Sequence, residues 1–112
     1  MAAWQQLSIY TSEGSRLGNR PLHSAIIATA LEKGIYSAIA IKAMEGFGPQ
    51  VAIPTANRLA LETDLPIEVR LIDQAEAIKS FLEAHKESLA NCVVACSTIE
   101  IIQGPDAIAT GQ

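Results

Sequence analysis

Ile67-Glu68-Val69-Arg70-Leu71 is the stretch that decides the fold, because apolar and charged residues alternate along it without a break. Successive side chains of a β-strand point to opposite faces of a sheet. The alternation therefore predicts a strand with one buried and one wetted face. A sheet with one wetted face is typical of antiparallel pairing, so the sequence predicts an antiparallel sheet.

The segment after this strand has the pattern of an amphipathic helix. Asp73 followed by Glu76 resembles a capping box at a helix start. Apolar residues continue at helical spacing as far as Leu89, and Asn91 is suited to close the helix in a left-handed conformation. Residues 92–102 then predict a long last strand.

The first half of the chain repeats this order of elements. Residues 7–12 alternate as a strand does, and residues 13–20 form a polar, glycine-containing loop. Pro21 is expected as the first helical residue, capped by Asn19, and Gly34 is expected to end the helix. The Ile- and Ala-rich residues 35–44 predict a second, more buried strand.

Strand, helix, strand, strand, helix, strand is the ferredoxin-like βαββαβ order of an α+β protein. We expect a four-stranded antiparallel sheet with two helices on one face, in a single domain over 1–112 with a core at about 7–102 and a tail at 103–112. The second face of the sheet is mixed in character but still apolar in part. Such a face is typical of a sheet that packs against other subunits.

Composition excludes several classes of function. The net charge is −4 and no basic patch interleaved with aromatic residues occurs, so nucleic-acid binding is not expected. No basic start with a long apolar run marks a signal peptide, and no apolar run approaches the ~20 residues of a membrane helix. The plain interpretation is a soluble cytoplasmic protein that is not itself inserted in a membrane.

The segment Lys42-Ala43-Met44-Glu45-Gly46-Phe47-Gly48-Pro49 breaks a strand abruptly and starts a long loop. Proline cannot continue a central ladder, and glycine permits backbone conformations that other residues resist. Long loops in small domains are usually functional or disordered. The excursion 45–58 holds Phe47, Pro54 and Arg58, which suit a ligand or partner better than a tether.

A second candidate is the loop at 12–20, where Arg16 and Arg20 flank Gly18 just before a helix. Two guanidinium groups beside a helix N-terminus can bind an anion. A solvated connecting loop is the plainer interpretation. The glycine spacing is that of neither a P-loop nor a dinucleotide-binding turn.

The cysteines and histidines offer little chemistry. Cys92 and Cys96 would lie ~13 Å apart along a strand, too far for a disulfide. They have no matched zinc partners, so buried packing is expected. His23 and His85 are expected at the surface or at the edge of the core. No nucleophile with a matched base is evident, so we expect no enzymatic activity.

Three motifs together resemble an uncharacterised (domain-of-unknown-function) family of the PII-like signalling superfamily. The motifs are Arg16-Leu17-Gly18-Asn19-Arg20-Pro21-Leu22, then Glu45-Gly46-Phe47-Gly48, then Asp64-Leu65-Pro66-Ile67-Glu68-Val69. The resemblance covers about residues 7–102. It implies a ferredoxin-like subunit in a PII-like homotrimer, with small effectors such as adenine nucleotides bound in clefts between subunits. It also implies partner contacts through the loop at 46–57, with a membrane transporter or channel as one partner.

The sequence departs from this pattern in three places. The segment 84–91 lacks the glycines of the PII phosphate loop, Pro54 stands where the family often has a histidine, and Lys42 replaces a common arginine. A lysine keeps the charge but not the planar fork of an arginine. ATP binding therefore does not carry over directly from the better-known relatives.

The resulting hypothesis is a cytoplasmic, non-enzymatic regulator that binds a small anionic effector. The candidate ligand-binding residues are Arg16, Gly18, Arg20, Lys42, Glu45, Gly46, Phe47, Gly48 and Arg58. Two alternatives stay open. One is a structural or interaction module without a ligand, and the other is a small enzyme that acts on an anionic substrate in the same clefts.

Overall fold

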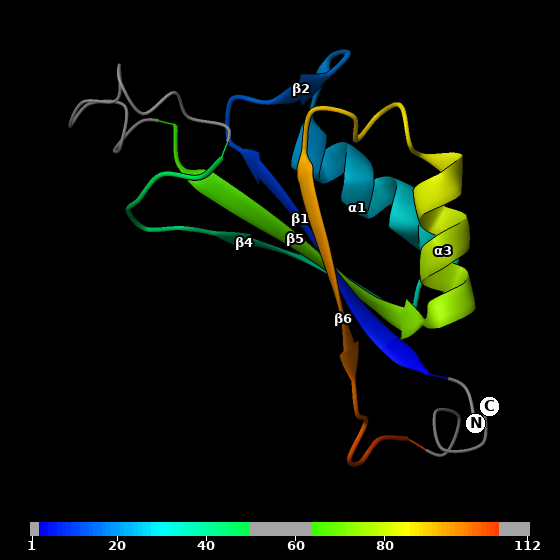
Figure 1. Cartoon of the computed structure of the whole chain (residues 1–112). Helices are drawn as coiled ribbons and strands as arrows, with labels where there is room; N and C mark the ends of the chain where they lie inside the picture. Colours follow the sequence, from blue (N-terminus) through cyan, green and yellow to red (C-terminus); the bar gives the residue numbers. More distant parts are fainter. Residues whose placement is uncertain (1–2, 50–63, 106–112) are drawn as a thin grey trace.

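The computed structural model describes residues 3–49 and 64–105, which form one sheet, one hairpin and two helices. Figure 1 shows both helices on the same side of the sheet. The elements are β1 (Trp4–Ser12), β2 (Arg16–Leu17), β3 (Arg20–Pro21), α1 (Leu22–Glu32), β4 (Ser37–Lys42), β5 (Pro66–Gln74), α3 (Ala75–Ala84) and β6 (Val93–Ile99).

The sheet has the strand order β4-β5-β1-β6, and every neighbouring pair is antiparallel. With helices after β1 and β5, this is the ferredoxin-like arrangement predicted from the sequence. The core lies between the sheet and the helices. It joins residues of the two central strands with residues of α1 and α3, among them Leu7, Ile9, Val69, Leu71, Ile26, Ala30, Ile78 and Phe81.

The predicted alternation of β5 is confirmed. Ile67, Val69 and Leu71 are buried under the helices, whereas Glu68 and Arg70 point to the opposite face. Their partners on β1 follow the same division, since Ile9 lies opposite Val69 and is also fully buried. The face without helices is called the open face below.

The prediction that residues 35–44 form a more buried strand is wrong for the single subunit. β4 spans Ser37–Lys42 only, and it is an edge strand. Ile39, Ile41 and, on the other edge, Val93 are 49%, 38% and 48% exposed. An apolar strand sequence predicts that the strand is buried. It does not distinguish burial by the same chain from burial by another chain.

Both predicted N-terminal helix caps are wrong. α1 begins at Leu22 with Pro21 as its N-cap residue, and no side chain caps it. The carboxylate of Asp73 accepts hydrogen bonds from the Tyr36 and Gln74 N–H groups at 3.0 and 2.6 Å, and Gln74 is the N-cap of α3. The Asp73 side chain therefore links β5 to Tyr36, the residue before β4.

Several boundaries also differ from the predictions. α3 ends at Ala84 with His85 as its C-cap residue, well before Asn91. β1 begins earlier, at Trp4, and β6 ends earlier, at Ile99. Gly34, with a φ of +74°, does follow the end of α1 as predicted. Most of the predicted loop at 13–20 belongs to the hairpin β2–β3, which ends at Pro21 and in which Leu17 lies opposite Arg20.

Neither helix in the described part of the chain has the length and apolar character needed to cross a bilayer. Of the predicted loop 46–57, the structure describes only Gly46 to Pro49. Arg58 and the last part of the predicted tail lie outside the described residues.

Candidate functional site

A groove of about 360 Å³ lies at the end of the sheet where β4 gives way to the loop. Four of the predicted site residues form one wall of it: Glu45, Gly46, Phe47 and Gly48. Tyr10, Ile41 and Glu68 contribute from β1, β4 and β5. Tyr10 and Ile41 are both register partners of Glu68, so the groove opens on the open face.

The chain turns sharply at Gly46 to form this wall. The last ladder contact is the Ala43 N–H donating to the Pro66 carbonyl at 2.9 Å. Gly46 then adopts a φ of +138°, which a residue with a side chain rarely adopts. This turn leaves Met44 96% exposed and Phe47 57% exposed. The expectation that a glycine sets the backbone here is confirmed for Gly46.

Glu13 ties together the two stems of the loop. Its Oε2 accepts the Lys42 ammonium at 2.8 Å, at the end of β4. Its Oε1 accepts the Leu65 N–H at 3.3 Å, and its own N–H donates to the Leu65 carbonyl at 3.0 Å, just before β5. The hydrogen bond from Lys42, followed by that from Leu65, lowers the pKa of the Glu13 carboxyl.

A second contact supports this arrangement. The Gly14 N–H donates to Asp64 Oδ1 at 2.9 Å, so the turn after β1 is joined again to the returning stem. Glu13 and Asp64 were not among the predicted site residues. Both lie in polar turns, and their partners are distant along the chain, so a single sequence gives no signal for these contacts.

Arg16 and Arg20 do not line the groove in the described part of the chain. Arg16 and Arg20 lie in the hairpin β2–β3 and are exposed. Arg16 Nη2 donates to the Asn19 carbonyl at 2.6 Å across the turn that contains Gly18. Lys42 stands just outside the groove, although its neighbours Ile41 and Ala43 line it. The predicted set is thus divided between the hairpin and the groove.

The open face also carries a polar cluster that the sequence placed on the wetted side. Ser8 Oγ donates to Glu68 Oε2 at 2.8 Å, and Arg70 Nε donates to the same oxygen at 2.9 Å. The hydrogen bond from Arg70 is the main cause of the lowered pKa of Glu68. Glu68 therefore brings to the lining of the groove a carboxylate that is paired with Arg70.

The cysteines and histidines add no cluster to this site. Cys96 is exposed, so the expectation that both cysteines are buried is wrong, because β6 is an edge strand. Cys92 is partly buried, and burial raises the pKa of its thiol. His23 and His85 are half-buried, as expected. Residues 3–49 and 64–105 contain no group of three or more acidic, histidine or cysteine side chains placed to hold a metal ion.

Comparison with known proteins gives matches over most of the chain. The profile of the DUF190 family, described as an uncharacterized ACR, matches residues 4–101. A UPF0166 protein of Aquifex aeolicus (strain VF5) is 31% identical over 96 residues, covering 86% of this chain and 90% of its own. Another UPF0166 protein of that organism is 22% identical over 95 residues, covering 85% of this chain and 93% of its own. The de novo designed protein Foldit4 is similar with a TM-score of 0.45 at 13% identity, covering 90% and 99% of the two chains.

Proposed function

Because this chain belongs to the DUF190 family, an uncharacterised family of the PII-like superfamily, we propose that it is a cytoplasmic regulatory protein and not an enzyme. In this proposal three copies form a homotrimer. A small anionic effector, with adenine nucleotides as the first candidates, binds in the clefts between subunits. The loop at 46–57 then regulates a partner protein.

The observation that carries the proposal is the groove at the root of the loop. Its wall is the segment 45–49, so a ligand in the groove contacts the backbone from which the loop leaves. A ligand that binds one arrangement of this segment better than another shifts the population of the two. The groove opens on the open face, where a neighbouring subunit would close it.

Among the described residues, the charged side chains that line the groove are Glu45 and Glu68, so in this proposal an anionic effector gains its cationic contacts at a subunit boundary. Lys42 stands beside the groove, with Glu13 as its present partner. Arg16 and Arg20 project from the hairpin and retain free donors for a phosphate or carboxylate in the assembled protein. The Glu68 carboxylate, which also lines the groove, would accept a donor such as an exocyclic amine of the effector.

The open face supports assembly. Ile39, Ile41 and Val93 expose apolar surface on the two edge strands, around the polar cluster of Glu68 and Arg70. Exposed apolar patches with polar neighbours mark interaction sites. A partner protein, for which a membrane transporter or channel is our candidate, would meet the loop beyond Phe47.

Binding is tested by calorimetry and thermal shift with ATP, ADP, AMP and pyrophosphate at constant ionic strength. A ligand at about 100 times its Kd should stabilise the protein by ~2.7 kcal/mol. Lys42→Gln should weaken binding, and Lys79→Gln, on the exposed side of α3, should not. Light scattering should give the mass of a trimer.

The same experiments separate the alternatives. If none of these anions binds and the protein is a trimer, the ligand-free interaction module is favoured, and the exposure of Met44 and Phe47 already suits that role. Turnover of a bound nucleotide, followed by chromatography of the products, would favour the enzyme. A monomer that binds no anion would overturn the proposal as a whole.

A further inference from the structure

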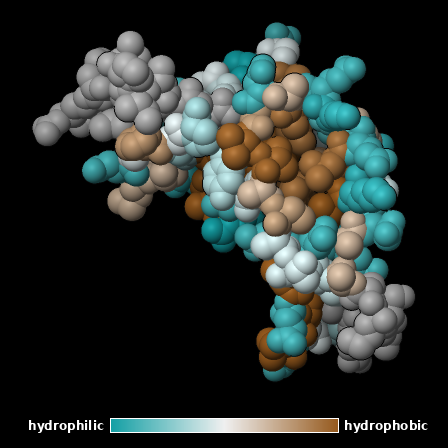
Figure 2. Space-filling view, in the orientation of Figure 1, coloured by the Kyte–Doolittle hydropathy of each residue, from teal (hydrophilic) through white to brown (hydrophobic). Residues whose placement is uncertain are grey.

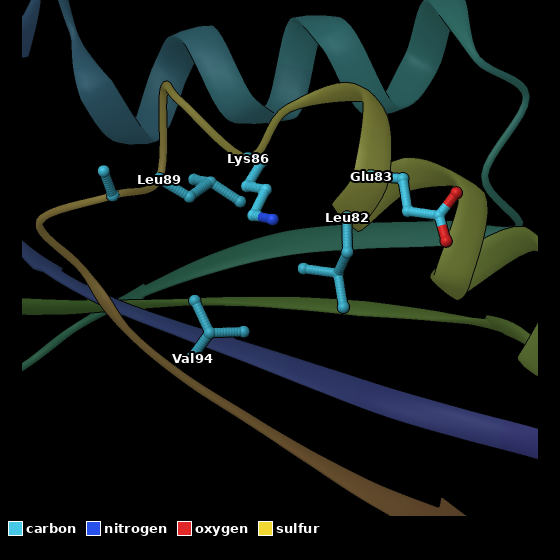
Figure 3. A pocket seen from close by; sticks show the side chains of 6 residues that line it. Leu82, Glu83, Lys86, Leu89 and Val94 are labelled. Carbon is cyan, nitrogen blue, oxygen red and sulfur yellow. The ribbon is translucent and has the colours of Figure 1, made fainter.

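A second groove lies on the helix side of the sheet, between the end of α3, the segment that follows it, and β6 (Figure 3). Its volume is about 380 Å³, and small-molecule sites range over roughly 300–1,000 Å³. The groove exists because α3 ends at Ala84 while the outermost strand continues beneath. Its lining is Leu82, Glu83, Lys86, Leu89, Ala90 and Val94.

The floor of this groove is aliphatic. Val94 lies opposite the fully buried Ile9 and so faces the helix layer, and Leu89 is itself part of the core. In the space-filling view, apolar side chains gather in the hollow between α3 and β6, with hydrophilic side chains at its border (Figure 2). A sugar or a base on this floor would lose hydrogen bonds to water without replacing them from the side chains beneath. An alkyl chain loses none.

Lys86 places a cation at the mouth of the groove. In Figure 3 its amino group lies in the space between Leu82 and Leu89, whereas the carboxylate of Glu83 points away from them. Within residues 3–49 and 64–105, Lys86 has no ion-pair partner. A lysine can cover an apolar surface with its stem and keep its charged end free for a ligand.

We propose that this groove binds a medium-chain aliphatic carboxylate. The alkyl chain lies on Leu82, Leu89 and Val94, and the carboxylate pairs with the Lys86 ammonium. This site is separate from the groove walled by residues 45–49, which we call the effector groove. It opens on the helix side of the sheet, whereas the proposed assembly uses the open face. It also does not depend on the proposed function, because no residue of the effector groove takes part.

Calorimetry with hexanoate, octanoate and decanoate below their micelle concentrations tests the proposal. Each added methylene should tighten binding about fourfold until the groove is full. Lys86→Gln should weaken binding roughly tenfold through loss of the charge-assisted contact. Lys79→Gln is the matched control, since Lys79 is exposed on α3 outside the groove. Alkylammonium ions of equal length should bind more weakly than the acids.

Methyl NMR locates the ligand independently of affinity. The methyl signals of Leu82, Leu89 and Val94 should shift on titration, and those of Val93 on the open face should not. Shifts confined to Val93 and Ile39, equal effects of the two lysine variants, or affinity independent of chain length would each overturn the proposal. The proposal would also be overturned if the protein floated with acidic phospholipid vesicles but bound none of the free acids. In that case the surface would be a membrane contact.

Discussion

Glu13, the residue after β1, and Lys42, the last residue of β4, form an ion pair of 2.8 Å. The same carboxylate accepts the Leu65 N–H at 3.3 Å, so one side chain holds the strand that leaves for the loop and the stem that returns from it. An anionic effector that paired with Lys42 would therefore compete with the Glu13 carboxylate.

Glu13→Gln should consequently tighten the binding of an anionic effector, because Lys42 loses its internal counter-ion. Calorimetry at low salt should show the gain, and added salt should reduce it, since exposed charges are screened. Glu87→Gln is the control, as it removes an exposed carboxylate in the segment that follows α3. If both variants change affinity equally, net charge and not the local pair would be responsible.

The same pair predicts how stability depends on pH. The pKa of Glu13 is lowered by Lys42, so its contribution to stability is present above the ordinary carboxyl pKa of 4.5. That contribution is lost as the pH falls through the lower value of the folded state. Denaturant unfolding should therefore show the wild type more stable than Glu13→Gln at pH 7, with the difference disappearing in acid. A difference that grew in acid would contradict the assignment.

Gly46 and Gly48 give a matched pair for testing the turn at the loop root. Gly46 has a φ of +138°, so Gly46→Ala should cost about 1–3 kcal/mol of unfolding free energy or reshape the groove wall. Gly48 has no such φ, and a Cβ added there would meet the Pro66 Cβ at 3.5 Å, an ordinary contact. Gly48→Ala should change stability little. Equal losses in urea unfolding would argue against a role for the backbone at Gly46.

The sequence predicted the fold well, because the decisive signals are local. The alternation from Ile67 to Leu71 reports a strand with one covered face, and it needs no knowledge of the partner strands. The helix limits were harder to predict. Asp73 has the chemistry of a cap, but the Tyr36 N–H, 37 residues away, takes its carboxylate. Tertiary contacts of this kind override local preference.

The candidate site was predicted only in part for the same reason. The segment from Glu45 to Gly48 carries its own turn signal, and the structure places it on one wall of the groove. Glu13 was missed, because its role arises only when two distant stems meet beside it. The exposure of Ile39 was also unpredictable, since composition does not distinguish burial within a chain from burial between chains.

The thiols should differ in reactivity. Cys96 is exposed, whereas Cys92 is partly buried and its pKa is raised by burial. Only the thiolate reacts quickly, so an alkylating reagent at neutral pH should modify Cys96 first and Cys92 more slowly. Mass spectrometry of peptides after timed quenching measures both rates. In Cys96→Ser, the fast phase should vanish and the slow phase should remain; a fast phase that persisted would contradict the burial of Cys92.

Assembly should depend on the open face and not on the helix face. Ile41→Asp places a charge on apolar surface that is 38% exposed in the single subunit. If neighbouring subunits cover this strand, the buried charge should dissociate them, because an unpaired charge is costly to bury. Light scattering should then show a smaller mass, with circular dichroism unchanged. Leu31→Asp, at an exposed position of α1, is the control and should leave the mass as it was. If only Leu31→Asp dissociated the protein, the interface would lie on the helix side, and the effector groove would be open to solvent.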